Sequence, residues 1–181
     1  MRSTTLQKIA VPGFGRKSTR LMLALAAALA MFGTAAVFAR PAPASAALVV
    51  EFQRLGTTLC ITENVAGNPQ LFEGICNAGN PRQRFIWFTQ AGHTGAKFVP
   101  QSVATNCLNV AGSSKAAGAK IVLSDCASDL SQDWFITSTP LLGFLIENAN
   151  SRLCITRTSV AFVQQPCSQS LPTQNFALNS V

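Results

Sequence analysis

The chain has 181 residues, a formal net charge of +7 and a hydrophobic content of 48%, with six cysteines and one histidine. Six of its fourteen basic residues lie before residue 47 and all seven acidic residues follow it, so residues 47–181 carry a net charge of only +1. A charge this small excludes a nucleic acid or an anionic membrane as the expected partner of that part, although the basic balance of the whole chain suggests one.

The first 46 residues have the order of a secretory signal. Five basic residues lie within Met1–Arg20, and the uncharged apolar run Leu21–Ala39 follows them. Ala44-Ser45-Ala46 then offers a cleavage site of the Ala-x-Ala type. We therefore expect residues 1–46 to be a signal peptide cleaved after Ala46, with a second possible cut after Ala39.

An alternative is that the apolar run remains as a membrane anchor. Its nineteen residues approach the roughly 20 that a spanning helix needs. In both cases the basic flank holds the amino terminus in the cytoplasm, and the rest of the chain crosses the membrane. We therefore expect a secreted or periplasmic protein that keeps no membrane span after cleavage.

All six cysteines lie in the portion that follows the signal, which is long enough for one domain with one core. An even number of cysteines in an oxidising compartment is interpreted first as three disulfides. A metal site is disfavoured because the sequence has no Cys-x-x-Cys and its only histidine, His93, lies in a glycine-containing loop. We expect no metal and no cofactor.

A threefold repeat runs through this portion. The first cysteine of each repeat is spaced by 47 residues in both steps. A second cysteine follows each one, and a Gln-x-aromatic motif begins six or seven residues after it. The three sets are Cys60, Cys76 and Gln83-Arg84-Phe85; Cys107, Cys126 and Gln132-Asp133-Trp134; and Cys154, Cys167 and Gln174-Asn175-Phe176.

Each repeat contains four short runs rich in Val, Ile, Leu and Phe, separated by Gly, Asn, Ser and Pro, as is typical of strands and turns. The twelve predicted strands are 49–53, 59–62, 70–73, 85–88, 97–99, 107–110, 120–124, 134–137, 143–147, 153–156, 161–164 and 176–178. No stretch of ten or more residues after the signal shows helical spacing of apolar positions. The pattern predicts a closed all-β architecture without exposed sheet edges.

These motifs, repeated three times over residues 48–179, resemble the ricin B-type lectin domains, which are β-trefoils. The resemblance implies one domain over residues 47–181, with twelve strands, a six-stranded barrel and three capping hairpins. It also implies that the aromatic residue of each Gln-x-aromatic motif is buried in a shared core, at Phe85, Trp134 and Phe176, and that each glutamine makes structural hydrogen bonds. The family's disulfides join the two cysteines of one repeat, here Cys60 to Cys76, Cys107 to Cys126 and Cys154 to Cys167.

The sugar-binding positions of the family are not preserved. The resemblance places an Asp two residues after each first cysteine, an aromatic residue two before each second cysteine, and an Asn before each Gln-x-aromatic. The nine residues at these positions are Thr62, Gly74 and Arg82; Asn109, Ser124 and Ser131; and Thr156, Gln165 and Thr173. None matches, and Asn109 is the nearest substitute, so Asn109 and Gln132 of the second repeat are the candidate ligand-binding residues.

The sequence offers little for catalysis. His93 has no nucleophile motif around it, so we interpret it as a surface-loop histidine. We interpret Asp125, Asp129 and Asp133 as turn residues. The segment 112–115 is a polar turn, which is either a solvated loop or a lid over a ligand, and it lacks the pattern of a phosphate-binding loop. We therefore expect no enzyme activity.

Two hypotheses about function remain. The first is an exported carbohydrate-binding module whose galactose sites have degenerated, with a glycan or glycoconjugate as partner. The second is a protein-interaction or cell-binding subunit of a secreted toxin or enzyme complex, as in the lectin-like subunits of cytolethal distending toxins, whose sugar sites are also degenerate. A protease inhibitor of the soybean-inhibitor trefoil type is disfavoured by the three Gln-x-aromatic motifs.

Overall fold

The computed structural model describes residues 47–64 and 68–181, so the predicted signal peptide lies outside the described residues. The described part of the chain forms twelve strands and two short 3-10 helices, and the predicted all-β class is confirmed. The strands are β1 Leu48–Arg54, β2 Leu59–Glu63, β3 Leu71–Ile75, β4 Phe85–Thr89, β5 Ala96–Pro100, β6 Asn106–Val110, β7 Ile121–Asp125, β8 Trp134–Ser138, β9 Phe144–Asn148, β10 Cys154–Arg157, β11 Phe162–Gln165 and β12 Phe176–Ser180. The helices are η1 Ala111–Ser113 and η2 Leu130–Gln132.

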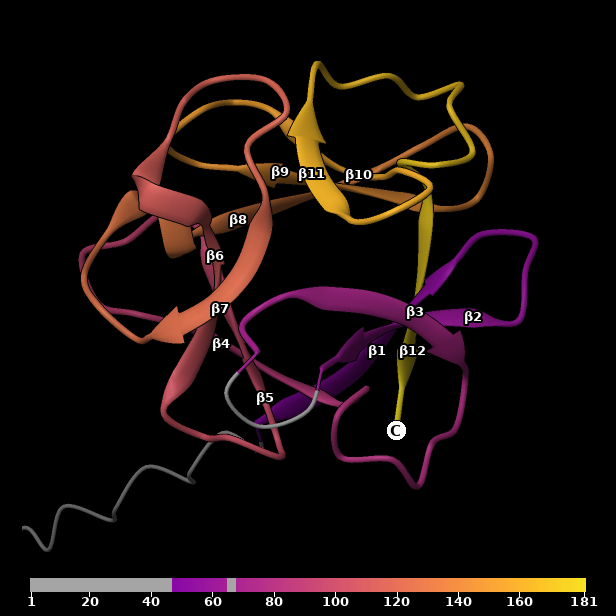
Figure 1. Ribbon diagram of the computed structural model, residues 1–181, viewed down its shortest axis with the longest axis horizontal. Helices are drawn as coiled ribbons and strands as arrows, with labels where there is room; N and C mark the ends of the chain where they lie inside the picture. The colour runs from indigo at the N-terminus through magenta and orange to yellow at the C-terminus, as the bar shows by residue number, and fades with distance from the viewer. Residues whose placement is uncertain (1–46, 65–67) are drawn as a thin grey trace, which may run out of the picture. The chain divides into compact units, whose positions relative to one another are not determined.

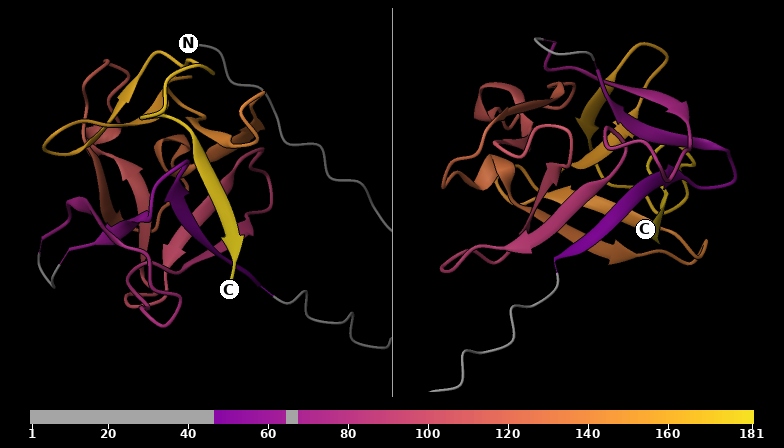
Figure 2. Two further views of the ribbon diagram at one scale, coloured as in Figure 1. Left: turned by 90° about the vertical axis from the view of Figure 1, so that its right-hand side faces the viewer. Right: turned by 90° about the horizontal axis from the view of Figure 1, so that it is seen from below.

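Six of these strands close into a barrel (Figures 1 and 2). Going round the ring, β1 pairs with β4, β4 with β5, β5 with β8, β8 with β9, β9 with β12, and β12 again with β1. All of these pairings are antiparallel. Closure leaves no unpaired edge strand in the ring, which is the property expected from three equal repeats.

The other six strands form three hairpins, one in each repeat. They are β2–β3, β6–β7 and β10–β11. Isolated bridges join Gln70 to Val122 and Lys120 to Val163, so the second hairpin lies beside both of the others. A barrel of six strands with three hairpins is the β-trefoil that the resemblance implies.

The aromatic residues of the three Gln-x-aromatic motifs lie in one hydrophobic core. Phe85 and Phe176 are fully buried and Trp134 is 1% exposed. Phe52 from β1 lies 5.4 Å from Phe85 between ring centroids. Each motif residue is the first of its strand, where the register of the barrel turns its side chain inward.

A glycine allows the close approach of chain segments in the second repeat. An ideal Cβ on Gly95 would lie 2.8 Å from the backbone nitrogen of Trp134 and 2.9 Å from the Cβ of Asp133. Gly95 directly precedes β5, and Ala96 pairs with Trp134 in the barrel. A side chain at position 95 would therefore push β5 away from β8.

The three disulfides join the cysteines within each repeat, as the resemblance implies. The described residues contain no free cysteine. Each bond closes a loop of fewer than twenty residues, for which the chain-entropy model gives about 3 kcal/mol of stabilisation. Three such bonds fit an extracellular or periplasmic protein.

A search of residues 47–64 and 68–181 finds no helix with the length and apolar character needed to cross a membrane.

Candidate functional site

The glutamine of each Gln-x-aromatic motif forms hydrogen bonds to the backbone on both sides of the second cysteine of its repeat. The side-chain oxygen accepts a hydrogen bond from the backbone nitrogen just after that cysteine, and the side-chain nitrogen donates to the carbonyl just before it. The acceptor distances are 2.7 Å for Gln83 with Asn77, 2.7 Å for Gln132 with Ala127 and 2.6 Å for Gln174 with Ser168. The donor distances are 3.0 Å to Ile75, 2.8 Å to Asp125 and 2.9 Å to Pro166.

This geometry gives Gln132 a structural role. Its side chain is 2% exposed, and both of its polar atoms bond to the chain's own backbone. A ligand that bonded to Gln132 would have to break its hydrogen bonds to Ala127 and Asp125. Gln132 thus bonds to the backbone, whereas the polar atoms of the other candidate residue, Asn109, bond to serine side chains.

In the first repeat, two of the family's sugar positions, Thr62 and Gly74, are closed to a ligand by internal contacts. The second N–H of Gln83 donates to Oγ1 of Thr62 at 2.9 Å, and that hydroxyl in turn donates to the Cys60 carbonyl at 3.0 Å. Thr62 is 3% exposed. A Cβ on Gly74 would lie 2.9 Å from Thr62 Oγ1, so there is no room for an aromatic side chain.

The third repeat has the same arrangement at the carboxylate position. Gln174 donates to Thr156 Oγ1 at 2.8 Å, and Thr156 donates to the Cys154 carbonyl at 3.1 Å. Thr156 is buried. In both outer repeats a threonine thus fills the position of the family's Asp and satisfies its hydroxyl internally.

The second repeat differs because Asn109 stands where the others have threonine. Asn109 is half-buried and is not bonded by Gln132. Its Nδ2 donates to Ser124 Oγ at 2.8 Å, and its Oδ1 accepts from Ser131 Oγ at 2.7 Å. The three family positions of this repeat therefore meet in one hydrogen-bonded cluster, with small polar side chains in place of the ring and the carboxylate.

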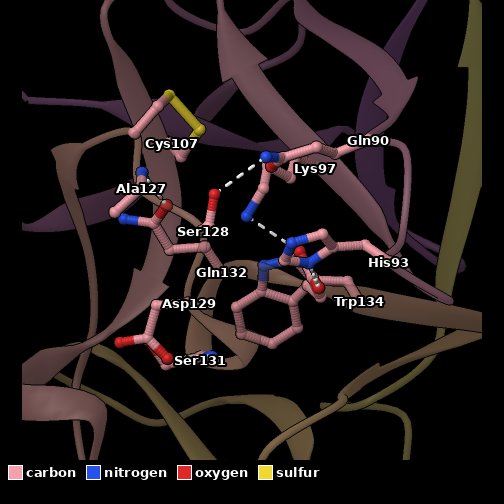
Figure 3. A network of polar contacts seen from close by, with 12 residues as sticks. Gln90, His93, Lys97, Cys107, Ala127, Ser128, Asp129, Ser131, Gln132 and Trp134 are labelled. Carbon is pink, nitrogen blue, oxygen red and sulfur yellow. Dashed lines mark hydrogen bonds and ion pairs between the residues drawn. A yellow bond between two sulfur atoms is a disulfide. The ribbon is translucent and has the colours of Figure 1, made fainter. Parts of the chain in front are cut away.

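A carboxylate from the loop that carries Ser131 joins this cluster. Asp129 caps the amino end of η2, accepting from the Ser131 backbone nitrogen at 3.0 Å, and Ser113 donates its hydroxyl to the other oxygen of Asp129. Ser113 Oγ also lies 3.2 Å from Ser131 Oγ. We name Asn109, Ser113, Ser124, Asp129 and Ser131 the second-repeat cluster. Figure 3 shows Asp129 and Ser131 on the loop that leads to Gln132 and Trp134.

Sequence reasoning placed Asp129 among the turn residues, and its capping of η2 agrees with that interpretation. Its contact with Ser113, sixteen residues earlier, was missed. No local pattern in the sequence connects these two residues.

The turn over residues 112–115 is hydrogen-bonded to side chains of the third repeat. Gly112 and Ser113 have positive φ values of 62° and 51°. The Ser113 carbonyl accepts from Asn150 at 3.0 Å, and the Ser114 carbonyl accepts from Gln164 at 2.9 Å. These contacts hold the turn against the third repeat, so it forms a fixed wall of the cluster rather than a freely solvated loop.

The hydrogen bond from Ser113, with help from the Ser131 backbone, holds the pKa of Asp129 below its ordinary value. Ser113→Ala is therefore expected to raise the pKa of Asp129. A carboxyl whose folded pKa is depressed adds stability above its unfolded pKa, and that stability is lost as the pH falls through the folded pKa. The variant should thus lose this contribution at a higher pH than the parent.

Carbon-detected NMR titration of the Asp129 carboxyl between about pH 2 and 6 measures the shift directly. Ser114→Ala is the matched control, because the Ser114 hydroxyl accepts from Ala116 and does not bond to Asp129. An unchanged Asp129 pKa in Ser113→Ala would contradict the assigned cause.

A second polar group, made of His93, Lys97 and Asp133, corrects the interpretation of His93. His93 is not a free surface histidine, because its side chain is 14% exposed and Nδ1 contacts Oδ2 of Asp133. Asp133 does lie in the loop between η2 and β8, but it is fully buried and also forms an ion pair with the buried Lys97 at 2.8 Å. Figure 3 shows Lys97 and His93 converging. Sequence reasoning missed both because the partners are about 40 residues apart.

Neither group resembles a metal site. The described residues contain no set of three or more His, Cys, Asp or Glu side chains arranged to hold a metal ion.

Comparison with known proteins identifies the fold. The family model described as "Ricin-type beta-trefoil lectin domain-like" matches residues 81–164. A search among curated proteins found no relative by sequence. Solved structures match at low sequence identity, which shows the fold alone.

Three of these structures show how different the proteins with this fold are. The designed threefold-symmetric protein ThreeFoil has a TM-score of 0.63 and 14% identity, over 72% of this chain and 96% of that one. A lectin from Polyporus squamosus, bound to the epitope Neu5Aca2-6Galb1-4GlcNAc, has a TM-score of 0.63 and 10% identity, over 76% of this chain and 50% of that one. A chain of the Haemophilus ducreyi cytolethal distending toxin has a TM-score of 0.57 and 14% identity, over 72% of this chain and 81% of that one.

Many matched chains are longer than this one, which spans between 17% and 50% of six of them. The threefold cysteine and Gln-x-aromatic pattern, the closed barrel with three hairpins, and the family match all agree. The described chain has the β-trefoil fold, and its residues 81–164 match the ricin-type, lectin-like family model.

Proposed function

We propose that this domain is a non-catalytic carbohydrate-binding module whose remaining family-type sugar site lies in the second repeat. The observation that carries this proposal is the contrast between repeats. The outer two repeats bury a threonine at the family's Asp position, whereas the second holds the half-buried amide of Asn109, which the hydroxyls of Ser131 and Ser113 link to the carboxylate of Asp129.

The chemistry of the second-repeat cluster suits sugar hydroxyls. Each hydroxyl can donate one hydrogen bond and accept others, and a cluster that contains an amide and a carboxylate offers both partners. Asn109, Ser113 and Asp129 now satisfy one another, directly or through Ser131. A sugar would exchange these internal bonds for bonds to its own hydroxyls, so the net gain is small.

We expect this domain to bind galactose and lactose more weakly than a ricin-type lectin that keeps the family's sugar-binding residues. No aromatic side chain stands at position 74, 124 or 165, and the strand position that carries the family's Asp holds an amide or a hydroxyl. Losing one stacking ring and one charge-assisted hydrogen bond removes on the order of 2 to 4 kcal/mol, a factor of roughly 30 to 1000 in affinity.

A glycan array followed by titration calorimetry on the best hit tests the site. Asn109→Ala should weaken binding by about tenfold, which corresponds to one lost hydrogen bond. Asn106→Ala is the matched control, because it lies on the same strand three positions away and so faces the opposite side of the sheet. Micromolar binding of lactose, or a hit unaffected by Asn109→Ala, would count against this placement.

A second function is favoured by the cytolethal distending toxin match, in which this chain spans 81% of a toxin chain. In this alternative the trefoil is an accessory subunit that binds a protein partner or a cell surface. A silent glycan array, together with a stable complex on co-expression with the product of an adjacent nuclease-like gene, would favour the accessory role.

Export through residues 1–46 belongs to the same proposal. It is supported by the signal-like order of those residues and by three disulfides, which need an oxidising compartment. Amino-terminal sequencing of the exported protein is expected to begin at Ala47. Recovery of the uncleaved chain in the membrane fraction would favour the anchor instead.

A further inference from the structure

An open pocket of about 220 Å³ lies between the β4–β5 hairpin and the segment that follows the second disulfide. Its wall is formed by Phe88, Gln90, Lys97, Cys126, Ala127 and Ser128. None of these residues occupies a sugar position of the family. Figure 3 shows Gln90 and Lys97 on one side and Ala127 and Ser128 on the other.

Lys97 lines this wall with a side chain whose ammonium group is buried. Its side chain is 2% exposed, and Nζ lies 2.8 Å from Oδ1 of Asp133. Nζ makes no hydrogen bond of good geometry to any described residue, although an ammonium group carries three N–H donors. Because Nζ is itself buried and paired with Asp133, Lys97 contributes its stem to the pocket wall rather than a free donor.

The hydrogen bond that spans the pocket leaves further groups for a ligand. Gln90 donates from Nε2 to Ser128 Oγ at 2.9 Å. This uses one amide proton and a lone pair of the hydroxyl, and it leaves the Gln90 side-chain oxygen as an acceptor and the Ser128 hydroxyl proton as a donor. Phe88, which is 38% exposed, adds an apolar ring to the same wall.

We infer that this pocket binds one ring of a neutral sugar, at a position distinct from the second-repeat cluster. A donor on Ser128 and an acceptor on Gln90, beside the exposed ring of Phe88, suit the hydroxyl groups and apolar face of a pyranose. The volume is below that of pockets for drug-sized ligands, which limits the occupant to a single ring. A neutral ligand is favoured over an anion because the carboxylate of Asp133 already balances the charge of Lys97.

The inference is tested by NMR titration of the isotope-labelled full chain with single sugars. The neutral probes are the methyl glycosides of galactose, glucose and mannose, and N-acetylglucosamine; glucuronate and inorganic sulfate are the charged probes, all up to about 20 mM. At least one neutral probe should cause saturable shifts of the Gln90, Ala127 and Ser128 amides. Ser128→Trp should weaken this binding by at least about tenfold, since Ser128 is exposed and a large side chain there fills the pocket.

Asn109→Ala separates this inference from the proposed function. It should leave the response of the pocket amides within about twofold of the parent, whichever way the glycan-array test comes out. Gln90→Ala is expected to weaken sugar binding by the same factor. If Ser128→Trp fails to fold, Gln90→Ala still tests the pocket. The inference is overturned if no neutral probe saturates at these amides, if only the charged probes do, or if neither pocket variant changes the binding.

Discussion

Trp134→Ala is expected to lower the free energy of unfolding by about 3 to 5 kcal/mol, more than any single loop substitution. Trp134 is 1% exposed, has the largest of the fully buried side chains, and belongs to the core cluster that also contains Phe85 and Phe176. Truncation leaves a void that neighbours on closed barrel strands cannot fill, because their backbones are held on both sides.

Trp134→Phe is the matched control. The equivalent positions of the other repeats hold phenylalanine, so the ring shape is compatible with the barrel. The variant still loses the hydrogen bond from Nε1 to the Leu108 carbonyl at 3.0 Å, and the buried acceptor left behind costs about 1 to 3 kcal/mol. Urea melts of the three proteins measure both effects. A loss below about 1 kcal/mol for Trp134→Ala would show that the indole does not support the core.

The barrel could be predicted from sequence because its three repeats repeat the same signals. Twelve apolar runs separated by turn residues correspond to the twelve observed strands, with bounds that differ by one or two residues. The difference at β3 is typical. The run predicted to end at residue 73 continues to Ile75, because pairing with Leu59 on β2 extends it toward Cys76. Tertiary pairing, not local sequence, sets where such a strand ends.

The polar groups could not be predicted in the same way, because the repeats share their backbone but not their charges. Val50 pairs with Phe85 and Ala96 pairs with Trp134, so the residues that follow, Glu51 and Lys97, occupy equivalent places in the barrel. Their neighbours at the middle of the Gln-x-aromatic motifs are Arg84 and Asp133, with the opposite charges. The first repeat thus carries the same pair of charges as the second, with the signs exchanged.

Burial has an energetic cost at the charged pair of the first repeat. It raises the pKa of Glu51, and the charge of Arg84 only partly opposes this. In the third repeat the corresponding motif position holds Asn175, whose amide donates to the backbone carbonyls of Gln169 and Leu171. Glu51 and Lys97 align with each other when the repeats are superposed on the first strand that each contributes to the barrel. When the repeats are aligned on their cysteines, which are 47 residues apart, these two residues fall one position apart.

Lys97→Met is expected to destabilise the domain by about 3 to 5 kcal/mol, because it removes the ammonium partner of a fully buried carboxylate. Methionine keeps most of the volume of the lysine stem, so the loss reports the unpaired charge of Asp133 rather than a cavity. His93 still contacts the other carboxylate oxygen, but at 14% exposure it is less deeply buried than Lys97.

The double variant Lys97→Met with Asp133→Asn decides between charge and packing. If the loss comes from the uncompensated carboxylate, the double variant should be more stable than Lys97→Met alone, and the double-mutant cycle should give a coupling energy of about 1 to 3 kcal/mol. Lys115→Met is the matched control on an exposed lysine and should change stability by less than about 0.5 kcal/mol. Denaturant melts at neutral pH measure all four variants, including Asp133→Asn alone. Additive losses for Lys97 and Asp133 would show that the pair contributes through packing and not through charge.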